Sequence, residues 1–269
     1  MEDEEAIQAK KMKSSRRNEL RNGPSMGSLQ VSPSKVKGRL AIPPSKSHTM
    51  RALLFGMLSS GKAIVDRFLP SPDTDAMIRA AALFGARIRR RGKMLFIEGG
   101  FGPAKDVIDA GNSGLILRLI GGISGLLPTY TVITGDRSIR ENRPVTPLLE
   151  GLQQLGAMAE STQLDGRAPI VIKGPIRPGK LTMDGQDSQP VSALIIATSL
   201  LNGPSEITVN NPGETPWIAL TLHWLEKFGG KVVHDNFCHY RVAGHLKIPD
   251  FHYAVPGDFS TAAFPIAAA

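Results

Sequence analysis

Three clusters of small polar residues stand just before long apolar segments, and each carries groups that bind anions. They are Pro44-Ser45-Lys46-Ser47, Gly111-Asn112-Ser113-Gly114 and Asp187-Ser188-Gln189. A helix that starts at such a cluster presents unpaired N–H groups and a partial positive charge, which suit phosphate and carboxylate groups. Lys46 and Arg51 add full charges beside the first cluster. Arg118 lies in the second apolar segment, and Arg143 precedes a further helix. The pattern predicts a site for a small ligand that carries phosphate, carboxylate or both.

Each of these residues also has a purely structural interpretation. Ser47 has the residue type of a helix cap, and 112–114 the residue types of a tight turn. Lys46 and Arg51 can be solvated, and Asp73 suits the first turn of a helix, where an acid favours the dipole. The recurrence of polar clusters at matching points of the chain favours the site.

Proline and glycine punctuate the chain with a period of about 72 residues. Pro72, Pro144 and Pro216 open helical patterns, which end at Gly85, Gly156 and Gly229. Proline suits the first helical position because it loses only an unpaired N–H, and glycine accepts the left-handed turn that ends a helix. The equal spacing predicts three copies of one unit.

Each copy contains the same predicted elements. The expected first strands lie at 39–42, 107–108 and 181–183, and the long helices at 48–58, 113–126 and 189–201. The strands that follow them lie at 63–65, 131–133 and 206–209. The proline-to-glycine helix and two more strands complete a β-α-β-α-β-β unit. Three such units predict an α/β fold over about residues 36–245.

Composition excludes several classes of protein. The chain has 269 residues, 41% of them hydrophobic, one cysteine and a net charge of +8. One cysteine excludes a disulfide framework and a Cys-rich zinc module. The longest apolar run, 113–127, is too short to span a membrane and contains Arg118. The acidic start at 2–5 argues against a signal peptide, so we expect a cytoplasmic protein. Residues 1–30 are polar and aperiodic, which predicts a disordered tail.

Other functional motifs are weak or missing. The basic stretch 87–93 is typical of a solvated strand, and no nucleic-acid-binding motif accompanies it. The chain has no glycine-rich nucleotide loop and no G-x-S-x-G hydrolase motif. The histidines and the cysteine within 234–252 lack the usual spacing of zinc ligands. We therefore predict no metal and no nucleic acid as a partner.

Taken together, the motifs resemble those of the 5-enolpyruvylshikimate-3-phosphate synthases, a family of enolpyruvyl transferases. The resemblance runs in order from about Val31 to the last residue. The segments that carry it are Ala41–Arg51, Gly111–Gly114 with Arg118, Arg140–Pro144, Ser188-Gln189 and Pro256–Ala263. It implies an inside-out α/β barrel of two domains, each with three β-α-β-α-β-β units. Residues 46–250 would be the three-repeat domain, 31–45 a crossing segment and 251–269 a stub of the second domain, which is mostly absent.

The resemblance also implies a reaction. The enolpyruvyl group of phosphoenolpyruvate passes to the 5-hydroxyl of shikimate 3-phosphate with release of phosphate, a step of aromatic amino acid biosynthesis that needs no cofactor. Lys46 would be catalytic and would contact both substrates. The other ligands of shikimate 3-phosphate would be Ser47, Arg51, Ser188 and Gln189. Those of phosphoenolpyruvate would be Asn112, Gly114 and Arg143. We expect a monomer that binds no membrane.

The sequence also departs from the family. Leu115 stands where Thr is usual, and Asp187 where a Ser often helps to bind phosphate. Glu214 and Trp217 replace a common Ser and Tyr. With the second domain mostly absent, we expect little or no turnover from the chain alone. The alternatives are a non-catalytic anion-binding domain, a relative of the UDP-sugar enolpyruvyl transferases and, from the charge alone, a nucleic-acid-binding domain.

Overall fold

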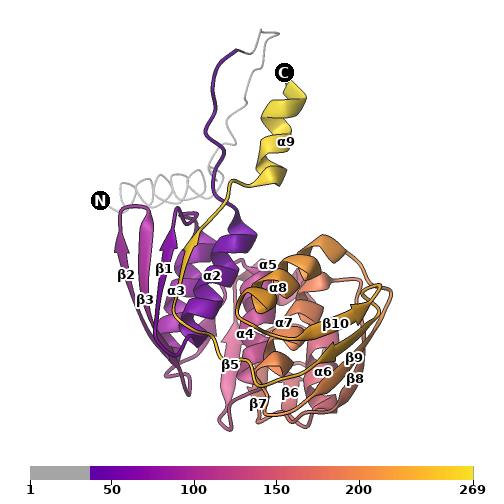
Figure 1. Cartoon of the computed structure of the whole chain (residues 1–269). Coiled ribbons are helices and arrows are strands. Elements are labelled where there is room, and N and C mark those ends of the chain that lie inside the picture. The colour runs from indigo at the N-terminus through magenta and orange to yellow at the C-terminus, as the bar shows by residue number, and fades with distance from the viewer. Residues whose placement is uncertain (1–36, 269) are drawn as a thin grey trace, which may run out of the picture. The chain divides into compact units, whose positions relative to one another are not determined.

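The computed structural model describes residues 37–268, and the expected disordered tail at 1–30 lies outside them. Residues 40–267 form one compact unit. Strands and helices alternate through it, as expected for an α/β protein (Figure 1). Each of its three sheets has four strands.

The first sheet has the order β12-β1-β3-β2, and helices α2 and α3 pack against it. The bounds are α2 (Lys46–Leu58), β1 (Lys62–Asp66), α3 (Pro72–Phe84), β2 (Gly85–Arg91), β3 (Met94–Phe101) and β12 (Phe251–Ala254). The second sheet has the order β4-β5-β7-β6. Its elements are β4 (Ile108–Asp109), α4 (Gly114–Ser124), β5 (Thr131–Thr134), α5 (Arg137–Asn142), α6 (Thr146–Gln154), β6 (Met158–Ser161) and β7 (Ile170–Lys173).

The third sheet has the order β8-β9-β11-β10. After its last strand the chain continues to β12 of the first sheet and ends with α9. The bounds are β8 (Lys180–Asp184), α7 (Ser188–Ser199), β9 (Ser205–Asn210), α8 (Thr215–Lys227), β10 (Val232–Asp235), β11 (His239–Val242) and α9 (Phe259–Ala268). In every sheet one edge pair is parallel and the other two pairings are antiparallel. The sheets therefore share one pairing pattern.

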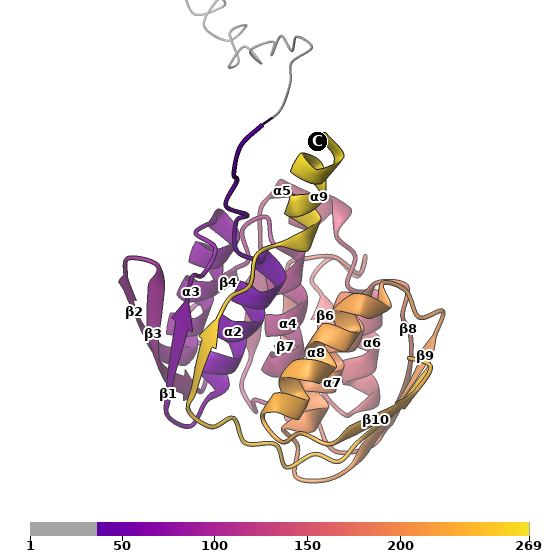
Figure 2. The same cartoon turned by 45° about the horizontal axis from the view of Figure 1, so that its top comes forward.

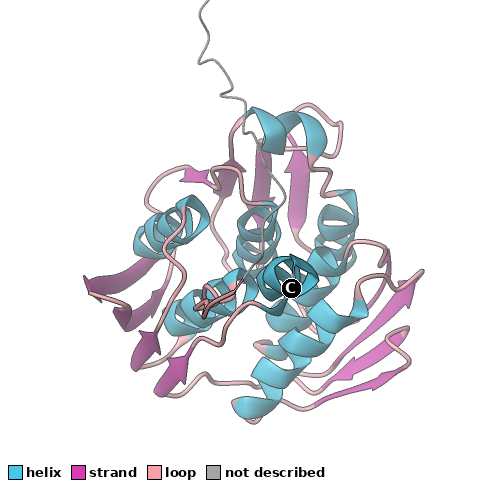
Figure 3. Cartoon of the chain, turned by 90° about the horizontal axis from the view of Figure 1, so that it is seen from above, coloured by secondary structure: helices cyan, strands magenta, loops and turns pink. Residues whose placement is uncertain are grey.

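The sheets lie around a central group of helices (Figures 2 and 3). Helices α4 and α7 pack against each other in that group, and nearly all of their residues are buried. Helices that are apolar on all sides need such an interior position. Gly122 of α4 lies against Ala193 of α7, where an added Cβ would come within 2.8 Å of the Ala193 Cβ. This contact lets the two helices approach closely, and at their starts an added Cβ on Gly114 would lie 3.7 Å from Gln189 Oε1.

The glycines that end the proline-opened helices have the expected left-handed backbone. Their φ angles are 113° at Gly85, 95° at Gly156 and 83° at Gly229. The predicted start at Pro144 is wrong, because α6 begins at Thr146. Two hydrogen bonds hold the residues before it outside the helix: Arg118 donates to the Pro144 carbonyl, and Val145 N donates to the Gly166 carbonyl.

The predicted strand at 39–42 is also wrong, because those residues form no strand. The place beside β1 belongs to β12, which pairs with it in parallel from Ala63↔Phe251 to Asp66↔Ala254. Aromatic contacts hold β12 there. The ring centres of Trp224 and Tyr253 are 4.3 Å apart, and those of Phe228 and Phe251 are 5.1 Å apart. Residues 251–254, expected in a stub of a second domain, thus complete the first sheet.

Candidate functional site

A hollow of about 300 Å³ lies where the first turns of α2, α4 and α7 meet. Residues just before α6 and at the start of α3 and α8 also line it. All eight residues predicted for the site are among its lining: Lys46, Ser47, Arg51, Asn112, Gly114, Arg143, Ser188 and Gln189. Residues from four separate segments of the sequence therefore share one surface.

Sequence reasoning did not place Asp73 in the site, although it lines the hollow. Asp73 follows Pro72 at the start of α3, as Trp217 follows Pro216 at the start of α8, and both side chains reach the hollow. The repeat would have revealed this, because the first turns of both helices occupy equivalent places. The side chains of Glu214 and Leu115, noted only as departures from the family, also line it.

Lys46 begins α2 and carries a half-exposed ammonium group. Its Nζ lies 3.3 Å from Asp73 Oδ2, and the Lys46 side chain is 52% exposed. An ion pair this exposed contributes about 0–1 kcal/mol, so Lys46 remains available to a ligand. Ser45, the residue before the helix, makes no side-chain cap, which leaves N–H groups of the first turn open.

Arg51 lies one turn further along α2 and is not solvated, since only 2% of it is exposed. Its Nε and Nη2 donate to Thr221 Oγ1 at 3.0 and 2.8 Å. Nη2 also donates to the Trp217 carbonyl at 3.1 Å, and Nη1 to the Ser47 carbonyl at 3.3 Å. No carboxylate of the described residues forms an ion pair with Arg51. Burial lowers the pKa of Arg51 to about 10. The hollow therefore contains a buried cation without a counter-ion.

The start of α4 combines a helix cap with a tight turn. Ser113 Oγ accepts from Ile116 N at 3.4 Å, and Gly111 has a φ of 58°. Asn112 Nδ2 donates to Asp136 Oδ2 at 2.5 Å. The Ile139 N–H and then the Asn112 amide lower the pKa of Asp136. The structural interpretation of this cluster therefore holds, and the same cluster lines the hollow.

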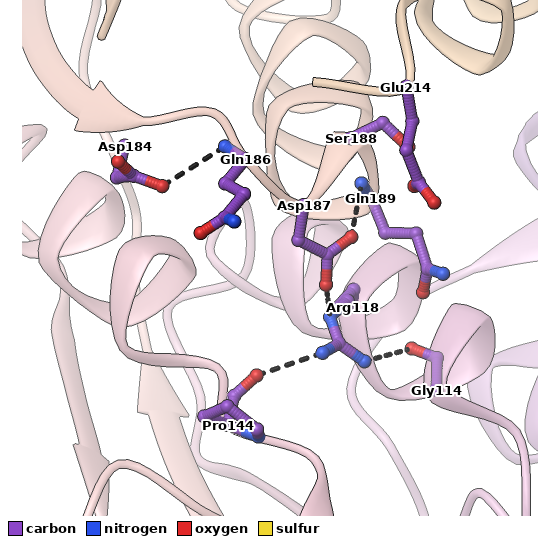
Figure 4. A network of polar contacts seen from close by, with 9 residues as sticks. All are labelled: Gly114, Arg118, Pro144, Asp184, Gln186, Asp187, Ser188, Gln189 and Glu214. Carbon is purple, nitrogen blue, oxygen red and sulfur yellow. Dashed lines mark hydrogen bonds and ion pairs between the residues drawn. The ribbon is translucent and has the colours of Figure 1, made fainter. Parts of the chain in front are cut away.

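Arg118 lies between Asp187, Pro144 and Gly114 and contacts all three (Figure 4). Its Nη1 donates to the Gly114 carbonyl at 3.1 Å and its Nη2 to the Pro144 carbonyl at 2.9 Å. Its Nε lies 2.9 Å from Asp187 Oδ2, an ion pair in which the N–H does not point straight at the oxygen. Burial lowers the pKa of Arg118, and Asp187 partly opposes this effect. Arg118 thus orients the backbone at Gly114 and at Pro144, the residue after Arg143.

Arg143 directly follows α5 and has an exposed side chain. Within residues 37–268 it forms no ion pair and donates no side-chain hydrogen bond. An exposed guanidinium with all its N–H groups unused is well suited to bind a carboxylate or a phosphate in two places.

His48, next to Ser47 in α2, links the edge of the site to β12. Its Nδ1 and the Tyr253 hydroxyl share a hydrogen bond of 2.6 Å. Burial lowers the pKa of His48 from 6.5, Arg51 and His223 lower it further, and Asp258 opposes them. The cation Lys227 also faces this contact, with Nζ 4.8 Å from the centre of the Tyr253 ring.

The shift in His48 predicts a loss of stability in mild acid. A histidine whose pKa is lower when folded contributes stability above its unfolded pKa of 6.5, and this contribution is lost as the pH falls below that value. Urea unfolding between about pH 7.5 and pH 5.5 should show a smaller loss for His48→Gln than for the wild type. His252→Gln, an exposed change on the same strand as Tyr253, should behave as the wild type does. If the free energy of unfolding fell by the same amount between these two pH values in all three proteins, the prediction would be wrong.

Residues 37–268 contain no group of three or more His, Cys, Asp or Glu side chains arranged to hold a metal ion. Within the same residues, every helix is too short or too polar to pass through a bilayer.

Comparisons with known proteins show the family of the chain. Residues 31–269 match the family model of EPSP synthase (3-phosphoshikimate 1-carboxyvinyltransferase). The chain belongs to the EPSP synthase family. A 3-phosphoshikimate 1-carboxyvinyltransferase of Chlamydia trachomatis is 41% identical over 239 residues, which are 88% of this chain and 54% of that protein. Its counterpart in Chlamydia pneumoniae is 39% identical over 247 residues, 91% of this chain and 55% of the relative.

Solved structures of the EPSP synthase family have the same fold. The EPSP synthase of Acinetobacter baumannii has a TM-score of 0.75 and 26% identity, over 84% of this chain and 51% of that one. The chain therefore spans about half the length of the family members it matches.

Proposed function

We propose that this chain takes part in enolpyruvyl transfer from phosphoenolpyruvate to the 5-hydroxyl of shikimate 3-phosphate, with release of phosphate. One observation carries the proposal: the eight residues that the family pattern assigns to the substrates line one hollow. Three pairing patterns of the same kind support the finer view that the fold is an inside-out α/β barrel built from three β-α-β-α-β-β units. In this proposal the protein is a cytoplasmic monomer and needs no cofactor.

The geometry suggests how the residues divide the work. Lys46 is half-exposed at the first position of α2. There its ammonium group contacts both the phosphoenolpyruvate and the attacking hydroxyl. Gly114 and Arg143 hold phosphoenolpyruvate, and Asn112 shapes the turn before Gly114. The chemistry needs cations in place before charge develops, so that positioning and charge stabilisation lower the barrier.

Shikimate 3-phosphate uses Lys46 together with the two flanking helices. Arg51 and Ser47 approach it from α2, and Ser188 and Gln189 from α7. The absence of a carboxylate beside Arg51 supports this assignment, because a ligand anion would supply the missing counter-ion.

Tryptophan fluorescence tests the binding step without turnover. The protein has two tryptophans: Trp217 is 38% exposed in the hollow, and Trp224 is fully buried. We expect shikimate 3-phosphate to change the emission of the wild type and not that of Trp217→Phe. At a concentration of 100 Kd it should stabilise the fold by about 2.7 kcal/mol. Lys46→Ala should weaken binding about tenfold, whereas Lys231→Ala, an exposed lysine far along the chain, should not.

We expect the chain alone to release little or no phosphate from phosphoenolpyruvate. A rate near that of an intact enzyme of the family would contradict this expectation and would exclude the non-catalytic anion-binding alternative. If shikimate 3-phosphate neither shifts the melting temperature nor changes the fluorescence, the proposal is wrong. A gain in stability with nucleic acid alone would favour the basic nucleic-acid-binding alternative.

A further inference from the structure

Strand β2 forms one edge of the first sheet and, among the described residues, pairs only with β3. It lies at the outer end of that sheet in both views (Figures 1 and 2). An edge strand of seven residues presents a row of backbone N–H and C=O groups to which a further strand can bond. No residue of β2 lines the hollow between α2, α4 and α7, so this edge is separate from the candidate site.

Three arginines share one face of this edge. Arg87, Arg89 and Arg91 alternate along β2, about 7 Å from one to the next. The side chains of Arg87 and Arg89 are 84% and 81% exposed, and both lie near Glu98, at 3.7 and 3.8 Å. These distances are too long for hydrogen bonds. Arg91 forms no ion pair within residues 37–268. One carboxylate therefore stands against three guanidinium groups, and their N–H groups remain open to a partner.

The surface beside these arginines is hollowed. A hollow of about 550 Å³ is lined by Arg89, Arg90, Arg91 and Phe96. A second hollow of about 210 Å³ shares Arg89 and Phe96 with the first, and its lining includes Ile64, which is paired with Phe96 across the sheet. A segment that docks along β2 would therefore find apolar contacts next to the charges.

Charge decides which kind of strand fits this edge. A second copy of β2 would place arginine beside arginine, and like charges on facing strands are unfavourable. The arginines therefore prevent pairing between copies of the chain at this edge. An acidic strand reverses the sign of the interaction, because each carboxylate would face a guanidinium group with open N–H groups. Nucleic acid is also anionic, but it has no peptide N–H and C=O groups with which to extend a sheet.

We propose that β2 is a docking edge for an acidic, extended segment of a partner protein. The segment adds a fifth strand to the first sheet, and its backbone pairs with that of β2. Aspartate or glutamate side chains at alternate positions of the segment face Arg87, Arg89 and Arg91. The proposal does not depend on the proposed function, since it concerns a different surface.

A labelled peptide of eight residues, in which glutamate and valine alternate, provides the probe. We expect the full chain to bind it and Arg89→Glu to bind it about tenfold more weakly, since an attraction becomes a repulsion. Arg241→Glu makes the same change at an exposed position of β11, which is not an edge strand, and should leave the affinity unchanged. If Arg89→Glu does not fold, Arg91→Glu carries the same expectation, because Arg91 lies on the same face of β2.

Two modified peptides separate strand pairing from charge attraction alone. One carries N-methyl groups on every glutamate and the other on every valine, so both keep the full charge. In a strand that pairs along one side, only alternate N–H groups face the neighbour. One modified peptide should therefore bind as the parent does, and the other at least about tenfold more weakly.

Equal affinities of the two modified peptides would overturn the proposal. So would equal affinities of the wild type and Arg89→Glu for the parent peptide, or no binding of that peptide to the wild type. If a single-stranded oligouridylate of the same charge binds more tightly than the peptide and loses affinity in Arg89→Glu, the edge binds nucleic acid and the proposal is wrong.

Discussion

Arg51→Met should lower the affinity for shikimate 3-phosphate about 100-fold without lowering the melting temperature. The guanidinium is buried and has no carboxylate partner, so the folded protein bears the cost of desolvating it. Methionine fills similar space without that cost. A bound anion would lose a charge-assisted hydrogen bond, since one N–H of Nη1 has no acceptor among the described residues.

Calorimetry of the ligand and thermal unfolding without it measure the two effects separately. Arg51→Lys keeps the charge but not the forked geometry and should fall between the wild type and Arg51→Met. A methionine variant that binds as tightly as the wild type would show that Arg51 has only a structural role. If the loss of folding stability equalled the loss of binding free energy, Arg51 would likewise have only a structural role.

Gly122→Val should destabilise the protein by about 3 kcal/mol and lower its melting temperature by about 6–12 °C. A side chain at this position meets the Ala193 Cβ at 2.8 Å and the Ala193 carbonyl at 2.9 Å, so α4 and α7 would have to separate. Since the starts of both helices line the hollow, ligand affinity should fall as well. Chemical unfolding measures the loss of stability, and a separate ligand titration of the folded variant measures the loss of affinity.

The companion change Ala193→Gly gives a matched control. It removes the nearest of the two clashing groups but leaves the carbonyl, so the double variant should recover part of the lost stability. If Gly122→Val is as stable as the wild type, the two helices do not pack as closely as described.

Local chemistry made most of the elements predictable from the sequence. Pro72 and Pro216 lie in the first turns of α3 and α8, and Gly85 and Gly229 follow those helices with positive φ. These signals depend only on neighbouring backbone atoms. Pro144 misled because a distant side chain, Arg118, holds its carbonyl outside the helix. Propensity carries no information about such a contact.

The sequence allowed us to predict which residues line the hollow, but not which hydrogen-bond partners and counter-ions these residues have. The three polar clusters indicated where the helices start, and the repeat indicated that the starts meet. Nothing in the order of residues says that the proton of Ser188 points at Glu214, or that Arg51 lacks a carboxylate. Both depend on residues that are distant in the sequence. Glu214 is 26 positions from Ser188, and Thr221 is 170 positions from Arg51.

The parallel partner of β1 comes from residues 251–254, almost the whole described chain away from it. During synthesis from the N-terminus, β1, β2 and β3 leave the ribosome long before the strand that completes their sheet. The edge of β1 must wait unpaired while the second and third sheets, whose strands are contiguous in the chain, can form. Unpaired strand edges favour aggregation, so we expect the first sheet to be the last of the three to be completed.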